Sequence, residues 1–115
     1  MYTLDKAVSM KKGVCGVYAI FISSNPKVAY IGSSKCIRRR LMSHLNQLKK
    51  GKHKNWKLQR MWGIYRNEFR WSILEISSSE YKARATEQLI LSTTDPDKLY
   101  NIDMTVYNYN HNKGK

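Results

Sequence analysis

Residues 16 to 34, GVYAIFISSNPKVAYIGSS, contain the pattern that decides the fold. The run over residues 16 to 22 is β-branched and aromatic and carries no charge, as in a buried strand. Residues 28 to 31, VAYI, read as a second strand. Between them, residues 23 to 27 supply turn chemistry, including Pro26, whose ring sets its own φ. The segment therefore predicts an antiparallel hairpin.

The residues that follow this hairpin predict a helix over residues 35 to 50, with Ser34 as its N-cap and Gly51 as its stop. Apolar residues recur there at helical spacing and define a stripe that faces the core: Ile37, Leu41, Leu45 and Leu48. A shorter helix should come next, built on Leu58, Met61, Trp62 and Tyr65.

One more strand and one more helix complete the predicted fold. Apolar and polar residues alternate over residues 69 to 76, which favours a strand. A capping box at residues 77 to 80 precedes a helix that should run to about Ser92, before the breaker DPD at residues 95 to 97. The order of elements predicts an α+β fold with a small, central, mainly antiparallel three-stranded sheet flanked by helices.

The composition is that of a soluble globular chain of 115 residues, of which 42% are hydrophobic and 25% are charged. This length suits one domain, which we place at residues 1–106, followed by a polar, mobile tail at residues 107–115. No stretch approaches the roughly 18 uncharged apolar residues of a membrane span, and the start lacks the order of a signal peptide. We therefore expect a cytoplasmic protein with no membrane partner.

Charge is the first indication of a partner. The chain has 21 Lys and Arg against eight Asp and Glu, for a net charge of +13. Residues 35 to 70 hold twelve basic residues and only Glu68 as an acid, so this segment carries twelve minus one, or +11. A polyanionic partner offsets the repulsion among so many positively charged side chains. Because Trp56, Trp62 and Tyr65 lie in the same segment, nucleic acid is favoured over a membrane surface.

Several side chains of the predicted elements suit phosphate chemistry. Tyr18 and Tyr30 lie in the hairpin, although tyrosines beside glycines are common in strands. Arg40 and His44 are four residues apart on the first helix and flank its apolar stripe. A guanidinium held there suits bidentate contact with a phosphate. Glu87 projects from a largely apolar part of the last helix, so its carboxylate needs a cation, either a metal ion or Arg40.

Together with the motifs around them, these residues resemble the GIY-YIG nuclease family. The matching motifs are Gly16-Val17-Tyr18, Tyr30-Ile31-Gly32-Ser33-Ser34, Arg40, His44, Gly51-Lys52-His53 with Leu58-Gln59-Arg60, Glu87, and Tyr100-Asn101. They occur in the family's order and spacing over about residues 14 to 103, and the catalytic domains of phage-type homing endonucleases look most similar. Val17 replaces the central isoleucine of the first motif. Homing enzymes of this family carry a separate DNA-binding region, and we expect none within these 115 residues.

The resemblance implies a role for each matching residue. Glu87 would bind Mg²⁺ or another divalent cation such as Mn²⁺, and Arg40 would hold the phosphate as charge builds in the transition state. Tyr18 is the preferred group for deprotonating the attacking water, and Tyr30 would position water or phosphate. His44 is an alternative base, or it holds Tyr18 in place; the sequence does not separate these two roles.

Two sets of residues complete the predicted site. Asn101 would orient the metal-binding end, whereas His53 has the spacing of a family histidine but lies in a basic loop suited to backbone phosphate. Contacts with DNA are expected from the charged segment, namely from Arg38, Arg39, Lys49, Lys50, Lys52, His53, Lys54, Lys57 and Arg60.

The resemblance implies a divalent-metal-dependent DNA endonuclease of phage or mobile-element type, acting in the interior of the host cell. It would hydrolyse phosphodiester bonds by nicking or by double-strand cleavage. The alternative is a non-catalytic basic module that binds nucleic acid, but such a module has no reason to retain all the matching residues together. One metal site cuts one strand per binding event, so double-strand cleavage requires a dimer on DNA, re-orientation of the bound chain or a second encounter.

Overall fold

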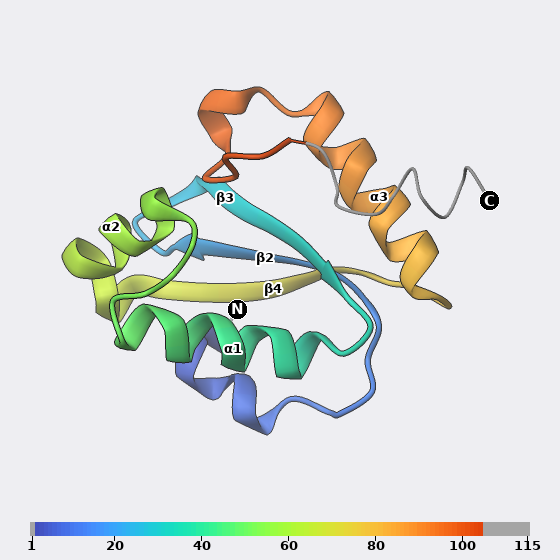
Figure 1. Ribbon diagram of the computed structural model, residues 1–115, viewed down its shortest axis with the longest axis horizontal. Helices are drawn as coiled ribbons and strands as arrows, with labels where there is room; N and C mark the ends of the chain where they lie inside the picture. The colour runs from blue at the N-terminus through green and yellow to red at the C-terminus, as the bar shows by residue number, and fades with distance from the viewer. Residues whose placement is uncertain (1, 105–115) are drawn as a thin grey trace.

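Strand β2 (Gly16–Ile22) lies inside a sheet whose strand order is β1-β4-β2-β3. It pairs antiparallel with β3 (Asn25–Ser34) on one side and with β4 (Phe69–Ile76) on the other. The computed structural model describes residues 2–104 (Figure 1). The predicted three-stranded antiparallel sheet is confirmed. A short fourth strand, β1 (Tyr2–Thr3), extends it beyond β4 and was not predicted, because two residues carry no periodicity.

Both faces of β2 are covered, and all seven of its residues are buried. Tyr18 and the other even-numbered residues face the core beneath helix α1 (Ile37–Lys49), whereas Val17 and the other odd-numbered residues face helix α3 (Glu80–Thr93). Figure 1 shows α1 and α3 on opposite sides of the sheet. This explains why β2 is a continuous apolar run rather than an alternating one.

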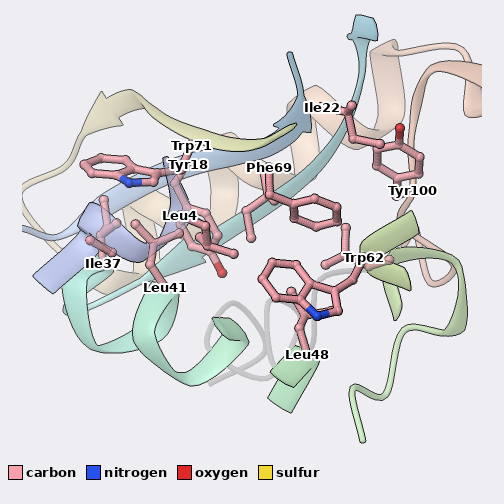
Figure 2. Packing of buried hydrophobic residues seen from close by; sticks show 13 residues of the cluster. Leu4, Tyr18, Ile22, Ile37, Leu41, Leu48, Trp62, Phe69, Trp71 and Tyr100 are labelled. Carbon is pink, nitrogen blue, oxygen red and sulfur yellow. The ribbon is translucent and has the colours of Figure 1, made fainter. Parts of the chain in front are cut away.

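The larger core lies on the α1 side of the sheet (Figure 2). The predicted apolar stripe of α1 faces it, although Leu45 is only partly buried. Helix α2 (Trp56–Tyr65) covers one end of this core, where Trp62 packs edge-on against Phe69 with ring centroids 5.2 Å apart. Tyr18 belongs to the same cluster. Its ring is therefore held by packing before any polar contact is considered.

Two element boundaries differ from the predictions for local reasons. Strand β3 begins at Asn25, so Pro26 lies within the strand rather than in the turn. Because β3 is an edge strand, the missing N–H of proline is tolerated there. Helix α1 begins at Ile37 with Cys36 as its N-cap residue. Ser34, the predicted cap, instead accepts a hydrogen bond of 3.0 Å from the Cys36 backbone N–H.

Short 3₁₀ helices connect the main elements: η1 (Leu4–Ser9), η2 (Arg66–Glu68) and η3 (Pro96–Lys98). Leu4 of η1 enters the larger core and closes it on the side of α1. No helix in residues 2–104 has the length and apolar character needed to cross a membrane. The predicted domain end at residue 106 and the tail at residues 107–115 lie outside the described residues.

Candidate active site

A hollow of about 340 Å³ lies over the edge strand β3. Because β3 is an edge strand of the sheet within residues 2–104, side chains from both sides of the sheet meet at its margin. Tyr18 and Tyr30 line the hollow together with Arg40 from the first turn of α1, and Glu87 enters from α3 on the opposite side. Four residues that the sequence assigned to the site, each from a different element, thus share one hollow.

The Tyr18 side chain extends from β2 past Gly32 of β3 and so reaches the hollow. The two residues are paired in the β2–β3 register. A Cβ atom at position 32 would overlap the Tyr18 hydroxyl and the ring carbon that bears it. Any side chain at this position would therefore displace the phenol. Tyr30 precedes Gly32 by two residues, which puts it on the same face of the strand as Tyr18.

Behind the hollow, Tyr18 begins a chain of hydrogen bonds. Its hydroxyl oxygen lies 2.7 Å from His44 Nε2. His44 Nδ1 lies 2.7 Å from His53 Nε2, and the two imidazole rings are stacked with centroids 5.0 Å apart. The chain ends at the backbone N–H of Asn55, which donates to His53 Nδ1 over 3.0 Å. His44 is buried, so no solvent competes with these contacts.

The backbone N–H of Asn55 decides which nitrogen of each ring carries a proton. Because His53 Nδ1 accepts, the neutral His53 ring has its proton on Nε2 and donates it to His44 Nδ1. His44 then has its own proton on Nε2 and donates it to the Tyr18 oxygen. Burial, together with the nearby Arg40 and His53, lowers the pKa of His44 to about 3, so the ring is neutral at pH 7. His44 is therefore a hydrogen-bond donor to Tyr18.

Arg40 supplies the positive charge beside the tyrosines. Its guanidinium hydrogen-bonds with the hydroxyls of Tyr18 and Tyr30. Burial, followed by Tyr30, raises the pKa of Tyr18 well above its ordinary value, while Arg40 acts in the opposite direction. Burial likewise raises the pKa of Tyr30 against the charge of Arg40. The Tyr18 oxygen thus faces two N–H donors, from His44 and Arg40, that stabilise a phenolate once further positive charge is present.

Glu87 forms the acidic side of the hollow. Ser33 donates a hydrogen bond to its Oε1. Burial raises the pKa of Glu87, whereas the Ser33 hydroxyl and the charges of Arg40 and Arg84 lower it. Within residues 2–104, no group of three His, Cys, Asp or Glu side chains is arranged to hold a metal ion. The hollow instead offers the Glu87 carboxylate, a second carboxylate that is paired with Arg84, and several hydroxyl oxygens, which suits a hard divalent cation that keeps water and phosphate ligands.

Arg84 and Glu80 also line the hollow, and the sequence-based site did not include them. They precede Glu87 by three and seven residues, so all three side chains lie on one face of α3. The Arg84 guanidinium forms an ion pair of 3.1 Å with Glu80. Helical spacing from Glu87 was the signal that could have revealed them. The hollow therefore contains two guanidinium groups, one from α1 and one from α3.

Asn101 and His53 lie elsewhere than predicted. The buried Asn101 amide accepts a hydrogen bond of 2.9 Å from the Ile31 N–H and donates one of 2.8 Å to the Ile31 carbonyl. It therefore anchors the edge strand and does not line the hollow. His53 was expected at a DNA phosphate, but both of its ring nitrogens are engaged, by His44 and by the Asn55 backbone.

A larger open groove of about 1430 Å³ adjoins the hollow, and Ser34 and Glu80 line both. It follows the outward face of α1 as far as Lys50. Its basic side chains are Lys12, Lys35, Arg38, Arg39 and Lys50. The remaining residues predicted to contact DNA do not line this groove and belong to the end of α1, to α2 or to the segment between them: Lys49, Lys52, Lys54, Lys57 and Arg60.

Residues 14–101 match the model of the GIY-YIG catalytic domain. The chain belongs to the GIY-YIG family. Over 60 residues this GIY-YIG chain is 43% identical to Intron-associated endonuclease 1 of Enterobacteria phage T4. That stretch is 52% of this chain, and the chain spans only about a quarter (24%) of the length of the phage protein.

Solved structures give the same assignment. The catalytic domain of homing endonuclease I-TevI is 32% identical, with a TM-score of 0.67 over 77% of this chain and 98% of that one. A mutant of the catalytic domain of intron endonuclease I-TevI is 31% identical, with a TM-score of 0.68 over 83% and 97% of the two chains. These similarities confirm the predicted GIY-YIG family and the α+β fold, and the similar proteins are themselves named as endonucleases.

Proposed function

We propose that this GIY-YIG chain is a divalent-metal-dependent DNA endonuclease of phage or mobile-element type, acting inside the host cell. The observation that carries the proposal is the meeting of Tyr18, Arg40 and Glu87 in one hollow. Phosphodiester hydrolysis needs a cation at the phosphate, an acceptor for the proton of the attacking water and stabilisation of the developing charge. The hollow offers a side chain for each of these tasks.

Arg40 holds the scissile phosphate. Hydrogen bonds with the Tyr18 and Tyr30 hydroxyls engage part of its guanidinium. A guanidinium has five N–H donors, so others remain for two oxygens of one phosphate. This contact strengthens as negative charge builds on the phosphate in the transition state.

Tyr18 accepts the proton of the attacking water. The Tyr18 hydroxyl first gives up its own proton to solvent. The water oxygen then forms a new bond to phosphorus and its proton passes to the phenolate, while the bond from phosphorus to the leaving sugar oxygen breaks and that oxygen takes up a proton from solvent. N–H donors from His44 and Arg40 stabilise that phenolate before the proton arrives. Tyr30, held by Arg40 on the same face of the sheet, positions the water or the phosphate.

Glu87 would hold the divalent cation, Mg²⁺ or Mn²⁺. Ser33 orients its carboxylate by donating a hydrogen bond to Oε1. When bound, the cation supplies positive charge that stabilises the transition state and lowers the pKa of neighbouring acids. The Arg84 guanidinium lies on the same face of α3 and gives the phosphate a second positive partner.

The groove along α1 is the proposed path of the DNA backbone, because it opens into the hollow and is lined by five basic side chains. One hollow hydrolyses one strand per binding event. We therefore propose that a single chain nicks DNA. Double-strand cleavage then requires two chains on one DNA molecule or a second binding event.

The test is incubation of supercoiled plasmid with the purified chain in Mg²⁺, in Mn²⁺ and in EDTA, followed by separation of nicked, linear and fragmented DNA. We expect nicked product first, and none in EDTA. Intact plasmid in both metals, despite retained binding to DNA, would show a non-catalytic nucleic-acid-binding module instead.

A further inference from the structure

Trp56 is exposed, whereas the other two tryptophans of the chain are buried. The exposed fraction is 59% for Trp56, 8% for Trp62 and 5% for Trp71. Its ring lies 5.9 Å from the Lys57 ammonium, within the range of a cation–π contact. The catalytic hollow does not use this residue. A single exposed ring is common on protein surfaces, so the surroundings of Trp56 decide what it does.

Those surroundings are basic and continuous with the groove. The sequence has no acidic residue from position 6 to position 67. The groove ends at Lys50, and the exposed Lys52 and Lys54 come next, before Trp56. Basic residues therefore follow one another along the chain from the end of the groove to the tryptophan, and we infer that they form one positively charged surface. A DNA strand that follows this surface reaches the indole ring.

The backbone that carries Trp56 is anchored on both sides. Gly51 adopts a φ of +70° that ends α1 and turns the chain. Asn55 caps α2 by accepting a hydrogen bond of 3.0 Å from the Leu58 N–H. The same side chain donates a hydrogen bond of 2.9 Å to the Tyr100 carbonyl. A ring on an anchored backbone loses little conformational entropy when it binds a ligand.

We propose that Trp56 stacks on an unpaired base of the bound DNA; this inference rests on the proposed function. An aromatic ring on a basic surface binds a base through its π face, and in an intact duplex neighbouring base pairs cover those faces. From Arg40 to Lys50 the backbone rises about 15 Å, the reach of four or five nucleotides at about 3.4 Å each, and Trp56 follows beyond Lys50 at the start of α2. The substrate class is therefore DNA with an unpaired base several nucleotides from the scissile phosphate, as in a bulge, flap or branch.

Tryptophan fluorescence tests this inference without metal and without cleavage. The whole chain in EDTA is titrated with a short single-stranded oligothymidine and, separately, with a blunt duplex of the same length. Affinity is measured in parallel from the fluorescence of labelled DNA. We expect saturable quenching of tryptophan emission by the single strand and little by the duplex. Trp56→Ala should abolish that quenching and lower single-strand affinity by about 5- to 150-fold, with duplex affinity unchanged.

Two variants serve as controls. Trp56→Phe retains a stacking ring, so its single-strand affinity should stay close to that of the wild type. Ile64→Ala removes another exposed apolar side chain of α2, 62% exposed, and should change neither affinity. Equal losses for single strand and duplex in Trp56→Ala, or no loss for either, would overturn the proposal. Because the assay needs no cleavage, a failed plasmid assay with intact quenching would overturn the proposed function alone.

Discussion

The Tyr18 hydroxyl and His44 Nε2 lie 2.7 Å apart, and the hydrogen between them belongs to His44. The Asn55 N–H, at the other end of this series of hydrogen bonds, fixes the direction of donation. Because it donates to His53 Nδ1, that nitrogen can only be an acceptor. In the proposed mechanism, this direction of donation makes His44 the support of a phenolate and Tyr18 the group that takes the proton of water. The sequence left this choice open.

Replacing either partner should separate the two roles. Tyr18→Phe keeps the packed ring and removes the hydroxyl, so turnover should fall by at least about 10²-fold with little change in stability. His44→Gln retains an N–H donor, whereas His44→Leu does not. Turnover of the glutamine variant should therefore exceed that of the leucine variant by about tenfold or more. Single-turnover cleavage rates measure both effects. Near wild-type cleavage by Tyr18→Phe, with His44→Gln inactive, would identify His44 as the base.

Arg84 should matter for catalysis more than for stability. Its ion pair with Glu80 is partly exposed and joins residues four apart on α3, so losing it should change the free energy of unfolding by less than about 1 kcal/mol. Because Arg84 lines the hollow, Arg84→Met should slow cleavage by about 10- to 100-fold. Lys82→Met, on an exposed position of the same helix, removes the same charge as a control. Equal cleavage rates for the two variants would show that Arg84 pairs with Glu80 and does not contribute to catalysis.

Acid should destabilise the protein partly through His44. Its pKa falls from an ordinary 6.5 to about 3 in the folded chain, chiefly because the ring is buried. The unfolded chain therefore binds a proton that the folded chain does not, and stability is lost as the pH falls from 6.5 toward 3. One such proton gives a slope of up to about 1.4 kcal/mol per pH unit. Urea unfolding between pH 6.5 and pH 3 measures the free energy of unfolding of the wild type and of His44→Gln. This free energy should fall less steeply with decreasing pH for His44→Gln than for the wild type. Carboxylates such as Glu87 are present in both proteins and contribute equally. Parallel slopes would contradict this.

The groove along α1 should control the salt dependence of binding. If about four to six phosphates are neutralised, the logarithm of affinity should fall with the logarithm of salt concentration with a slope of about −4 to −5. Replacing Lys35 and Arg39, which line the groove, by glutamine should reduce that slope by about two. The same change at the exposed Lys27 and Lys98, outside the groove, should have a smaller effect. A slope near zero would mean that the basic surface does not neutralise DNA phosphates.

Local pattern was enough to predict most of the fold. The alternation that begins at Phe69 predicted β4 with the bounds that the structure shows. The serine-rich capping box predicted the start of α3, where Ser79 accepts a hydrogen bond from the Lys82 N–H. Strand β1 was missed because its two residues are defined only by their partners on β4. Pro26 was misplaced because tolerance of proline in a strand depends on that strand's position at the sheet edge.

The candidate site was predictable where its residues belong to a motif and not where it depends on long-range contacts. Tyr18 and Tyr30 were predicted from the motifs that resemble the GIY-YIG family, and they do line one hollow. Arg84 was missed because its importance arises only where α3 meets the edge strand. Asn101 and His53 lie outside the hollow for the same reason. The backbone of Ile31, 70 residues away, engages Asn101, and the side chain of His44 engages His53.

In the proposed mechanism, Glu87 is the carboxylate at which a divalent cation supports phosphodiester hydrolysis. The most direct measurement is the rate of plasmid nicking by Glu87→Gln in saturating Mg²⁺, with DNA affinity and unfolding measured on the same protein. Glu68→Gln, which changes a carboxylate that does not line the hollow, is the matched control. We expect Glu87→Gln to bind DNA and fold normally but to show no detectable nicking, while Glu68→Gln nicks at the wild-type rate. Robust nicking by Glu87→Gln would contradict this role of Glu87.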